Sequence, residues 1–308
     1  MSKEKSYNRY RWKWENNSKY KFLEIVPIHL DIELTTQCNY RCIMCFQAME
    51  EIPKIEMPLK LVKRIIKEFA IKGGSSIKFV YRGEPLLYNN LTRVIKYAKK
   101  KGIIDTIINT NGSLLNETKA LGLIESGLDK LVFSVDSCIP STYKKIRVGG
   151  ILPLVEKNIR YIQELKRRLN KKSPLVSVQC IIQDYNKDEL ESGQFTNYWK
   201  GIVDVININP LCVNVLNKID PGELKGFFCE GVYQRMTIRA NGDLCLCCGI
   251  DSDSKILGNA YIDSIEDIWL GDQFIQIRDN MDNGDSHLIE PCRICDLRIN
   301  YKENHKNE

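Results

Sequence analysis

Residues 28–45 read IHLDIELTTQCNYRCIMC. Their first part, Ile28–Leu34, is a short run rich in branched apolar residues, which predicts a strand. Cys38, Cys42 and Cys45 follow directly, so we expect three thiolates on the loop at the carboxyl end of that strand, where catalytic groups of parallel β/α folds gather. Cysteines four and three residues apart can offer one thiolate to each of three irons of a cubane and leave the fourth iron open. The stretch predicts a reactive iron–sulfur site, with a zinc knuckle or a cluster closed by a remote cysteine as alternatives.

Strand-like runs alternate with amphipathic helical stretches from about residue 28 to residue 209. The helical stretches repeat apolar residues at helical spacing, as in 59–69 and 152–165. This alternation predicts βα units and a parallel sheet. Six units are too few for a closed eight-stranded barrel, so we expect an α/β fold with a partial, TIM-like (β/α)6 barrel and a site at the carboxyl ends of its strands. The six expected strands are Ile28–Leu34, Ile77–Tyr81, Thr106–Thr110, Lys130–Val135, Val176–Ile182 and Val203–Asn209.

The pattern changes after Pro210, where a small α+β unit is expected. Its predicted elements are a linker at Pro221-Gly222, a hairpin of Met236–Arg239 and Leu244–Cys248 with a type I′ turn at Asn241-Gly242, and helices at Ser264–Trp269 and Gln273–Met281. So small a unit would gain much of its stability from a bound metal or cluster. The predicted parts of the chain are an N-terminal extension (1–27), a barrel (28–220) and an iron–sulfur unit (221–308).

The composition is that of an ordinary soluble globular protein, with 43% hydrophobic and 27% charged residues in 308. The first 20 residues are polar and basic, and no apolar run is long enough for a membrane span. We therefore expect a cytoplasmic protein with no membrane partner. The net charge of +6 is a mild excess, and the basic and aromatic stretch Arg9–Trp14 has no nucleic-acid motif beside it, so no nucleic-acid partner is expected.

Cysteine is unusually common, with 12 in the chain, and a second group lies in the C-terminal unit. In a chain without a secretory signal, clustered cysteines indicate metal or iron–sulfur ligation rather than disulfides. If the hairpin strand is regular, Cys245 and Cys247 point to one face and Cys248 to the other, so either of the first two could be a ligand. Zinc is the alternative to a cluster here, because two cysteine pairs suffice for it.

Four further motifs follow the cysteine loop in chain order, each near the end of an expected strand or after it. Together with Cys38-x3-Cys42-x2-Cys45-Phe46, they make the chain resemble the radical S-adenosylmethionine (radical SAM) superfamily. Arg82 stands where the family's Gly-Gly-Glu-Pro turn has its first glycine. The motifs are Arg82-Gly83-Glu84-Pro85, Asn109-Thr110-Asn111-Gly112, Ser134-Val135-Asp136 and Arg147.

The resemblance implies a [4Fe–4S] cluster held by Cys38, Cys42 and Cys45, with S-adenosylmethionine bound to its open iron. The other residues implied to bind this cofactor are Phe46 over the adenine, the backbone of Gly83, Glu84 and Pro85 at the methionine amino group, Asn111 and Asp136 facing the cofactor, and Ser134 with Arg147 at its carboxylate.

The C-terminal unit resembles the one-cluster "twitch" module, a shortened relative of the SPASM domain. Cys229, Gly242 and Cys247 have the spacing that begins the SPASM pattern, and the pair Cys292 and Cys295 follows downstream with no later cysteine. The resemblance implies that these four cysteines hold one auxiliary [4Fe–4S] cluster suited to electron transfer. The family spacing after Gly242 favours Cys247 as the hairpin ligand.

The cysteine layout resembles that of the radical 2-deoxy-scyllo-inosamine dehydrogenases. It implies an oxidoreductase that takes a hydrogen atom from a substrate carbon and oxidises a hydroxyl of a sugar or cyclitol, with the auxiliary cluster as electron acceptor. An electron donor such as flavodoxin or ferredoxin would reduce the first cluster.

Other functions stay open beside oxidation. Cys248, or else Cys245, could donate a hydrogen atom from its thiol in a radical epimerase of a sugar or peptide, although either could be only a buried thiol. Peptide maturation is a third possibility. A non-enzymatic iron–sulfur or zinc protein would not need Gly83-Glu84-Pro85 together with the pair Ser134 and Arg147.

Overall fold

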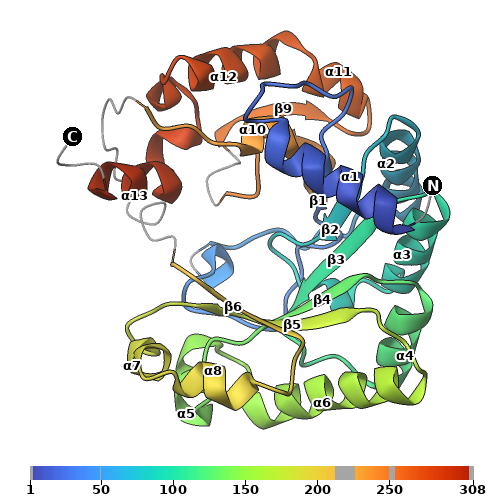
Figure 1. The fold of residues 1–308 in the computed structure, drawn as a ribbon, viewed down its shortest axis with the longest axis vertical. Coiled ribbons are helices and arrows are strands. Elements are labelled where there is room, and N and C mark those ends of the chain that lie inside the picture. The colour runs from blue at the N-terminus through green and yellow to red at the C-terminus, as the bar shows by residue number, and fades with distance from the viewer. Residues whose placement is uncertain (1–2, 49, 212–225, 250–253, 305–308) are drawn as a thin grey trace.

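The computed structural model describes residues 3–48, 50–211, 226–249 and 254–304. One nine-stranded sheet runs through it in the order β6-β5-β4-β3-β2-β1-β7-β8-β9 (Figure 1). The six predicted barrel strands are confirmed, and each pairs in parallel with the next along the chain. Their bounds are β1 His29–Ile32, β2 Ser76–Phe79, β3 Asp105–Thr110, β4 Lys130–Ser134, β5 Leu175–Ile181 and β6 Val205–Asn209. The partial (β/α)6 barrel is therefore confirmed.

Helices connect these strands and cover the outer face of the sheet, as the periodicity predicts. None of the described helices has both the length and the apolar character that a bilayer span requires. The α-helices are α1 Lys3–Asn16, α2 Leu59–Ile71, α3 Leu91–Lys100, α4 Glu117–Glu125, α5 Pro140–Ile146, α6 Leu152–Arg168, α7 Lys187–Glu191, α8 Gln194–Trp199, α10 Gly231–Gln234, α11 Ile265–Trp269, α12 Asp272–Asp282 and α13 Asp296–Asn304. The short 3-10 helices are η1 Phe46–Ala48, η2 Pro85–Leu87, η4 Ser286–Leu288 and η5 Cys292–Ile294.

The two faces of the barrel sheet differ in character, because successive side chains of a strand point to opposite sides. On the outer face, Leu30, Ile108 and Phe133 are fully buried beneath the helices. On the inner face, Lys78 and Asn109 are only partly buried. The apolar core therefore lies between sheet and helices, and the inner face carries accessible polar groups.

The C-terminal unit continues the same sheet. Its first strand, β7 (Arg235–Ile238), pairs in parallel with β1, and β8 (Asp243–Cys245) and β9 (Ile256–Asn259) follow antiparallel. Barrel and hairpin thus share hydrogen bonds along β1. The predicted linker Pro221-Gly222 and the boundary between residues 220 and 221 lie outside the described residues.

The predicted hairpin is confirmed, but its type I′ turn is wrong. A type I′ turn needs a positive φ at both central residues, whereas Gly242 has φ +90° and Asn241 is not in the left-handed region. The Gly242 N–H donates to the carbonyl of Arg239, and the Arg239 N–H donates to the carbonyl of Asp243. This is a type I turn followed by a glycine bulge, which a three-residue loop favours.

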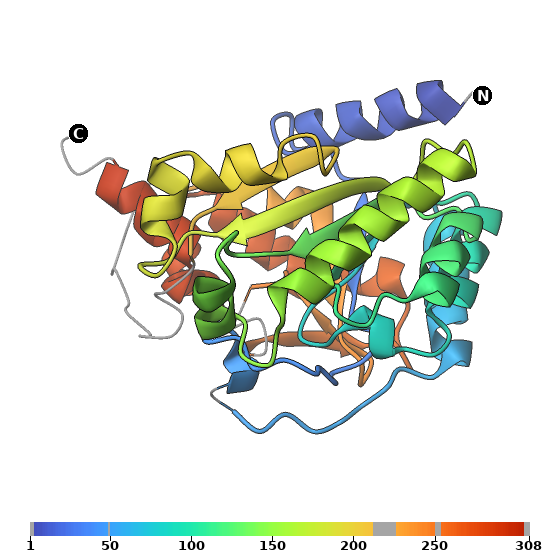
Figure 2. The ribbon, with the colours of Figure 1, turned by 90° about the horizontal axis from the view of Figure 1, so that it is seen from below.

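Helix α1, which no pattern in the sequence predicted, crosses the amino-terminal ends of the strands. Trp14 packs edge-on against His29 and lies under the guanidinium of Arg235, which are the first residues of β1 and β7. Lys130, the first residue of β4, donates to the hydroxyl of Tyr7 at 3.4 Å. Figure 2 shows α1 at the top and η1 (blue) below, with the strands between them. Residues of the N-terminal extension therefore close the end of the barrel opposite the cysteine loop.

Gly112, after β3, allows a direct test of this packing. Gly112 and Gly102 both have positive φ, but a Cβ at 112 would lie 2.5 Å from the Phe133 ring, whereas a Cβ at 102 would meet nothing within 4 Å. Both alanine variants carry backbone strain of about 1 kcal/mol, and Gly112→Ala adds overpacking of about 1–3 kcal/mol. Urea denaturation should therefore show a larger loss of unfolding free energy for Gly112→Ala, and equal losses would contradict this packing.

Candidate functional site

The first cysteine loop leaves β1 and folds into a compact turn. The Cys45 N–H donates to the carbonyl of Cys42 at 2.9 Å, and the Tyr40 N–H donates to the Cys38 sulfur at 3.4 Å. Burial raises the pKa of Cys38 to about 11 and also raises that of Cys45, and the neighbouring loop thiols add to both shifts. The three predicted ligands therefore lie together, and iron binding would release the protons of Cys38 and Cys45.

The turn after β2 is held against this loop. A Cβ at Gly83 would overlap the carbonyl oxygen of Thr35, so only glycine fits there. The Glu84 carboxylate accepts hydrogen bonds from the Thr110 hydroxyl at 2.6 Å and the Asn111 N–H at 2.8 Å. Burial raises the pKa of Glu84. In the structure the Glu84 side chain thus ties the end of β2 to the end of β3.

Asn111 extends this bonding to the cysteine loop. Its side-chain amide donates to the Asn39 side chain at 2.9 Å, and its Oδ1 accepts from the Ser113 N–H. Asn111 therefore lies beside the cysteine loop. Pro85, which begins η2, is buried. The side chain of Phe46 lies outside the described part of the structure.

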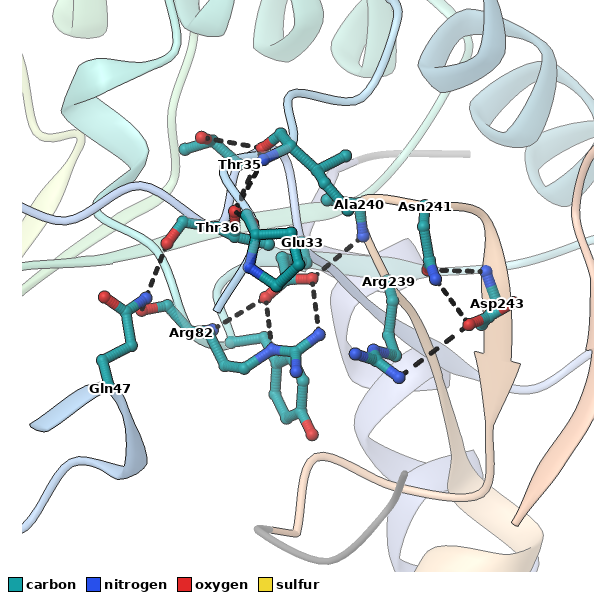
Figure 3. A network of polar contacts seen from close by, with 12 residues as sticks. Glu33, Thr35, Thr36, Gln47, Arg82, Arg239, Ala240, Asn241 and Asp243 are labelled. Carbon is teal, nitrogen blue, oxygen red and sulfur yellow. Dashed lines mark hydrogen bonds and ion pairs between the residues drawn. The ribbon is translucent and has the colours of Figure 1, made fainter. Parts of the chain in front are cut away.

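Arg82, which departs from the family pattern, belongs to a buried network (Figure 3). Its guanidinium donates to both oxygens of Glu33, at 3.0 and 3.3 Å, and its backbone N–H donates to the same carboxylate. The Ala240 N–H of the β7–β8 turn donates to Glu33 at 3.0 Å. Gln47 of the cysteine loop donates to the Arg82 carbonyl at 2.6 Å. Glu33 and Arg82 thus join the two barrel strands, the hairpin and the cysteine loop.

Asp136 and Arg147 form a second buried pair at the end of β4. The Arg147 Nε donates to Asp136 Oδ2, and Arg147 Nη1 lies 3.5 Å from the Cys42 sulfur. The other Asp136 oxygen accepts from the Ile181 N–H at 2.8 Å. Ser134 lies on the inner face, and no described hydrogen bond joins it to Arg147. The structure therefore links Arg147 to the cysteine loop through Cys42.

The four predicted auxiliary ligands come from separate elements of the C-terminal unit. The pKa of each of these four thiols is raised, and burial is the largest cause of each rise. The charge of Cys229 acts on the other three thiols, and that of Cys292 acts on Cys247. Because Cys229 acts on all three of the other thiols, the four lie near one another. They are Cys229 before α10, Cys247 after β8, Cys292 in η5 and Cys295 before α13.

In the described part of the chain, no three His, Cys, Asp or Glu side chains converge closely enough to hold a single metal ion. A cubane needs a wider arrangement, because each thiolate binds a different iron.

The remaining hairpin cysteines differ in accessibility. Strand β8 ends at Cys245, so the predicted strand to Cys248 is wrong and strict alternation does not reach that residue. Cys245 is 0% exposed. Cys248 is exposed, and its sulfur lies 4.0 Å from Arg235. Although the side chain is exposed, loss of water around its sulfur raises the pKa of Cys248. The charge of Asp31 adds to the rise, while Arg235 and Lys78 oppose it. Cys248 is thus an accessible thiol beside inner-face residues.

Sequence reasoning missed the inner-face residues Asp31, Lys78 and Glu33. The available signal was the alternation in β1, where His29, Asp31 and Glu33 stand between apolar residues that face the core. Which alternate set would face the site could not be assigned from the sequence, because it depends on the curvature of the sheet.

A family model described as the radical SAM superfamily matches residues 32–192, just over half of the chain. A second, described as an iron–sulfur cluster-binding domain (SPASM), matches residues 229–296.

Among curated proteins, a probable GTP 3′,8-cyclase of Methanococcus maripaludis is 37% identical over 130 residues, which is 42% of this chain and 43% of that protein. A tungsten-containing aldehyde ferredoxin oxidoreductase cofactor-modifying protein of Pyrococcus furiosus is 26% identical over 197 residues, 62% of this chain and 54% of that protein. The chain therefore matches about half the length of these relatives.

Three solved structures have the same fold. BtrN, in complex with AdoMet and 2-DOIA, has a TM-score of 0.59 and 19% identity, covering 89% of this chain and 94% of BtrN. Streptococcus suis SuiB bound to S-adenosylmethionine has a TM-score of 0.61 and 19% identity, covering 86% and 70%. The protein anSMEcpe with bound AdoMet has a TM-score of 0.62 and 14% identity, covering 87% and 84%.

Iron counting tests the choice of hairpin ligand. Reconstituted protein should hold about eight irons per chain if it carries two cubanes. Cys247→Ser should leave about four, because one auxiliary ligand is lost, while the matched variant Cys245→Ser should keep about eight. Four irons in Cys245→Ser and eight in Cys247→Ser would reverse the assignment.

The Glu33 network predicts a stability cost for restoring the family's glycine. Arg82→Gly leaves the Glu33 charge without its cation, which costs about 3–5 kcal/mol at a buried pair. A cavity of about 260 Å³ lined by both residues admits water, so we expect about 3 kcal/mol in urea denaturation. Adding Glu33→Gln should recover part of the loss. A double variant less stable than Arg82→Gly would contradict this account.

Proposed function

This chain belongs to the radical SAM superfamily, and we propose that it cleaves S-adenosylmethionine reductively and takes a hydrogen atom from a carbon of a polar small molecule. Family membership implies S-adenosylmethionine and a [4Fe–4S] cluster, and the SPASM match implies an auxiliary cluster. When bound, these groups supply the electron and the 5′-deoxyadenosyl radical. The observation that carries this proposal is the position of three thiols at the carboxyl edge of the barrel. The inner face of the sheet exposes polar side chains beside them.

The residues at this edge fit the implied groups. Cys38, Cys42 and Cys45 would hold one cubane and leave one iron for the cofactor. Arg147 has five N–H donors. It can therefore retain its contacts with Asp136 and Cys42 and also donate a hydrogen bond to the cofactor carboxylate. In this proposal Arg147 both orients Cys42 and binds cofactor. A flavodoxin or ferredoxin would be the electron donor.

The inner face supports a sugar or cyclitol as substrate. Asn109, Gln179 and Ser134 are partly exposed there, and the Asn109 amide lies 3.4 Å from Gln179. Amide and hydroxyl groups both donate and accept hydrogen bonds, as sugar hydroxyls do. The GTP 3′,8-cyclase relatives match between 42% and 56% of this chain, which supports a shared core rather than a shared substrate.

The position of Cys248 supports return of a hydrogen atom to the substrate radical, and hence epimerisation. In that step the Cys248 S–H bond breaks, a C–H bond forms on the substrate carbon, and a thiyl radical remains. Restoring the thiol takes one proton from water and one electron, and the adjacent Cys247 would hold the cluster that supplies the electron. A thiol that served only as core filling would be buried, as Cys245 is.

Oxidation of a hydroxyl is the second candidate. The four auxiliary thiols favour it, because a cluster fully ligated by protein suits electron transfer. In this route the substrate radical would pass one electron to the auxiliary cluster and its hydroxyl proton to water, and a carbonyl would form. No solvent hydrogen then reaches the reacting carbon.

Turnover in D2O separates the two routes. With flavodoxin or dithionite as reductant and a sugar that stimulates 5′-deoxyadenosine formation, the thiol route should leave one deuterium on the inverted carbon, because S–H exchanges with water. Cys248→Ala should abolish deuterium incorporation while 5′-deoxyadenosine still forms, and Cys245→Ala should retain both.

A carbonyl product without deuterium would establish oxidation instead. Protein with both clusters that forms no 5′-deoxyadenosine under any of these conditions would overturn the enzymatic proposal itself.

A further inference from the structure

Three polar atoms at the junction of β1 and β7 have no hydrogen-bond partner among the described residues. They are Asp31 Oδ2, Thr237 Oγ1 and Arg235 Nε. Asp31 is 1% exposed and Thr237 is 0% exposed. Buried polar groups in folded proteins nearly always have partners, and leaving one unpaired costs about 1–3 kcal/mol. A group from outside the chain would satisfy them.

These side chains are neighbours on the inner face. Asp31 stands opposite Thr237 on one side and opposite Lys78 on the other, and Arg235 stands opposite His29. The other Asp31 oxygen lies 3.3 Å from His29 Nε2. Burial opposes ionisation of Asp31, but His29, Lys78 and Arg235 together lower its pKa. The site therefore presents a carboxylate beside two cations.

The exposed thiol of Cys248 adjoins the same group. Arg235 Nη1 lies 4.0 Å from its sulfur, and the charges of Asp31 and Lys78 both act on it. The segment after β8 is held over the barrel by the Tyr81 hydroxyl, which donates to the Gly249 carbonyl at 3.4 Å. Whatever binds at Asp31 and Lys78 therefore lies next to Cys248, the most exposed of the three hairpin thiols.

The chemistry of these groups selects a polyol. A carboxylate only accepts hydrogen bonds, ammonium and guanidinium groups only donate, and a threonine hydroxyl does both. Two neighbouring hydroxyls of a sugar can donate to Asp31 and accept from Lys78 and Arg235 at once. A phosphate would meet the cations but would lie against the Asp31 charge without a proton to share.

We propose that Asp31, Lys78, Arg235 and Thr237 form a subsite for a vicinal diol of a sugar or cyclitol, which positions the substrate beside Cys248. The subsite rests on the proposed function, because it deepens the choice of substrate. In this subsite, Asp31 and Lys78 are the residues that determine substrate specificity.

Binding without turnover tests the subsite. The probes are myo-inositol, D-glucose and D-glucosamine, with cyclohexanol as the control that lacks neighbouring hydroxyls. Each is titrated by calorimetry into protein holding both clusters and S-adenosylmethionine, without reductant. At least one polyol should bind, and cyclohexanol should not.

Two variants then locate the binding. Lys78→Met and Asp31→Asn each remove a charged hydrogen-bonding group, so each should raise the dissociation constant of the bound polyol about tenfold or more. Lys157→Met, an exposed lysine on α6, is the matched control and should change nothing. Lys78 is partly exposed, so its variant tests the subsite even if Asp31→Asn fails to fold.

Binding of no polyol, binding of cyclohexanol as tightly as a polyol, or equal polyol affinity in Lys78→Met and wild type would overturn the subsite. The last result would leave a trapped water as the partner of Asp31. Formation of 5′-deoxyadenosine, measured on the same preparations with reductant, reports on the proposed function separately. Cleavage of S-adenosylmethionine without polyol binding contradicts only the subsite. Polyol binding without this cleavage contradicts only the proposed function.

Discussion

The buried carboxylate of Glu33 is the interaction on which the arrangement of the site depends. It is 1% exposed, directly follows β1, and receives hydrogen bonds from Arg82 after β2 and from Ala240 after β7. A buried charge must be paired and hydrogen-bonded to be tolerated, so these three chain segments cannot move apart independently. The hairpin that carries Cys247 and Cys248 is therefore held in register with the strand that leads to the first cysteine loop.

Local patterns in the sequence predicted much of this architecture. The six barrel strands and the helices α2, α6, α11 and α12 follow from periodicity, which depends on neighbours within a few residues. The cysteine loop also follows from local spacing. The auxiliary cysteines are far apart in sequence, and only the family pattern pointed to them as one set. For Cys229, which precedes α10, and Cys292, which lies in η5, the structure adds what spacing could not: the two thiols are close enough for the charge of Cys229 to raise the pKa of Cys292.

The rest depended on contacts between distant residues. Nothing in Arg235–Ile238 indicates that it pairs with β1, and Arg82 looks like a departure from the family turn until Glu33 is seen beside it. The predicted type I′ turn at Asn241-Gly242 is wrong because this dipeptide occurs in both two-residue and three-residue hairpin loops. The strand register decides between the two loop types. Helix α1 has mostly polar residues, and a few aromatic contacts at strand ends hold it in place.

The pairing of β7 with β1 also explains why the inner face can be polar. In an ordinary parallel sheet both faces are covered by helices and both are apolar. Here helices cover the outer face, and the inner face of β1 and β2 lies under the hairpin segment with Cys248 and Gly249. Polar side chains such as Lys78 and Asp31 can then remain without an apolar layer against them. Strand β7 thus joins the barrel to the hairpin segment that carries both Cys247, a predicted auxiliary ligand, and Cys248, the thiol beside the proposed substrate position.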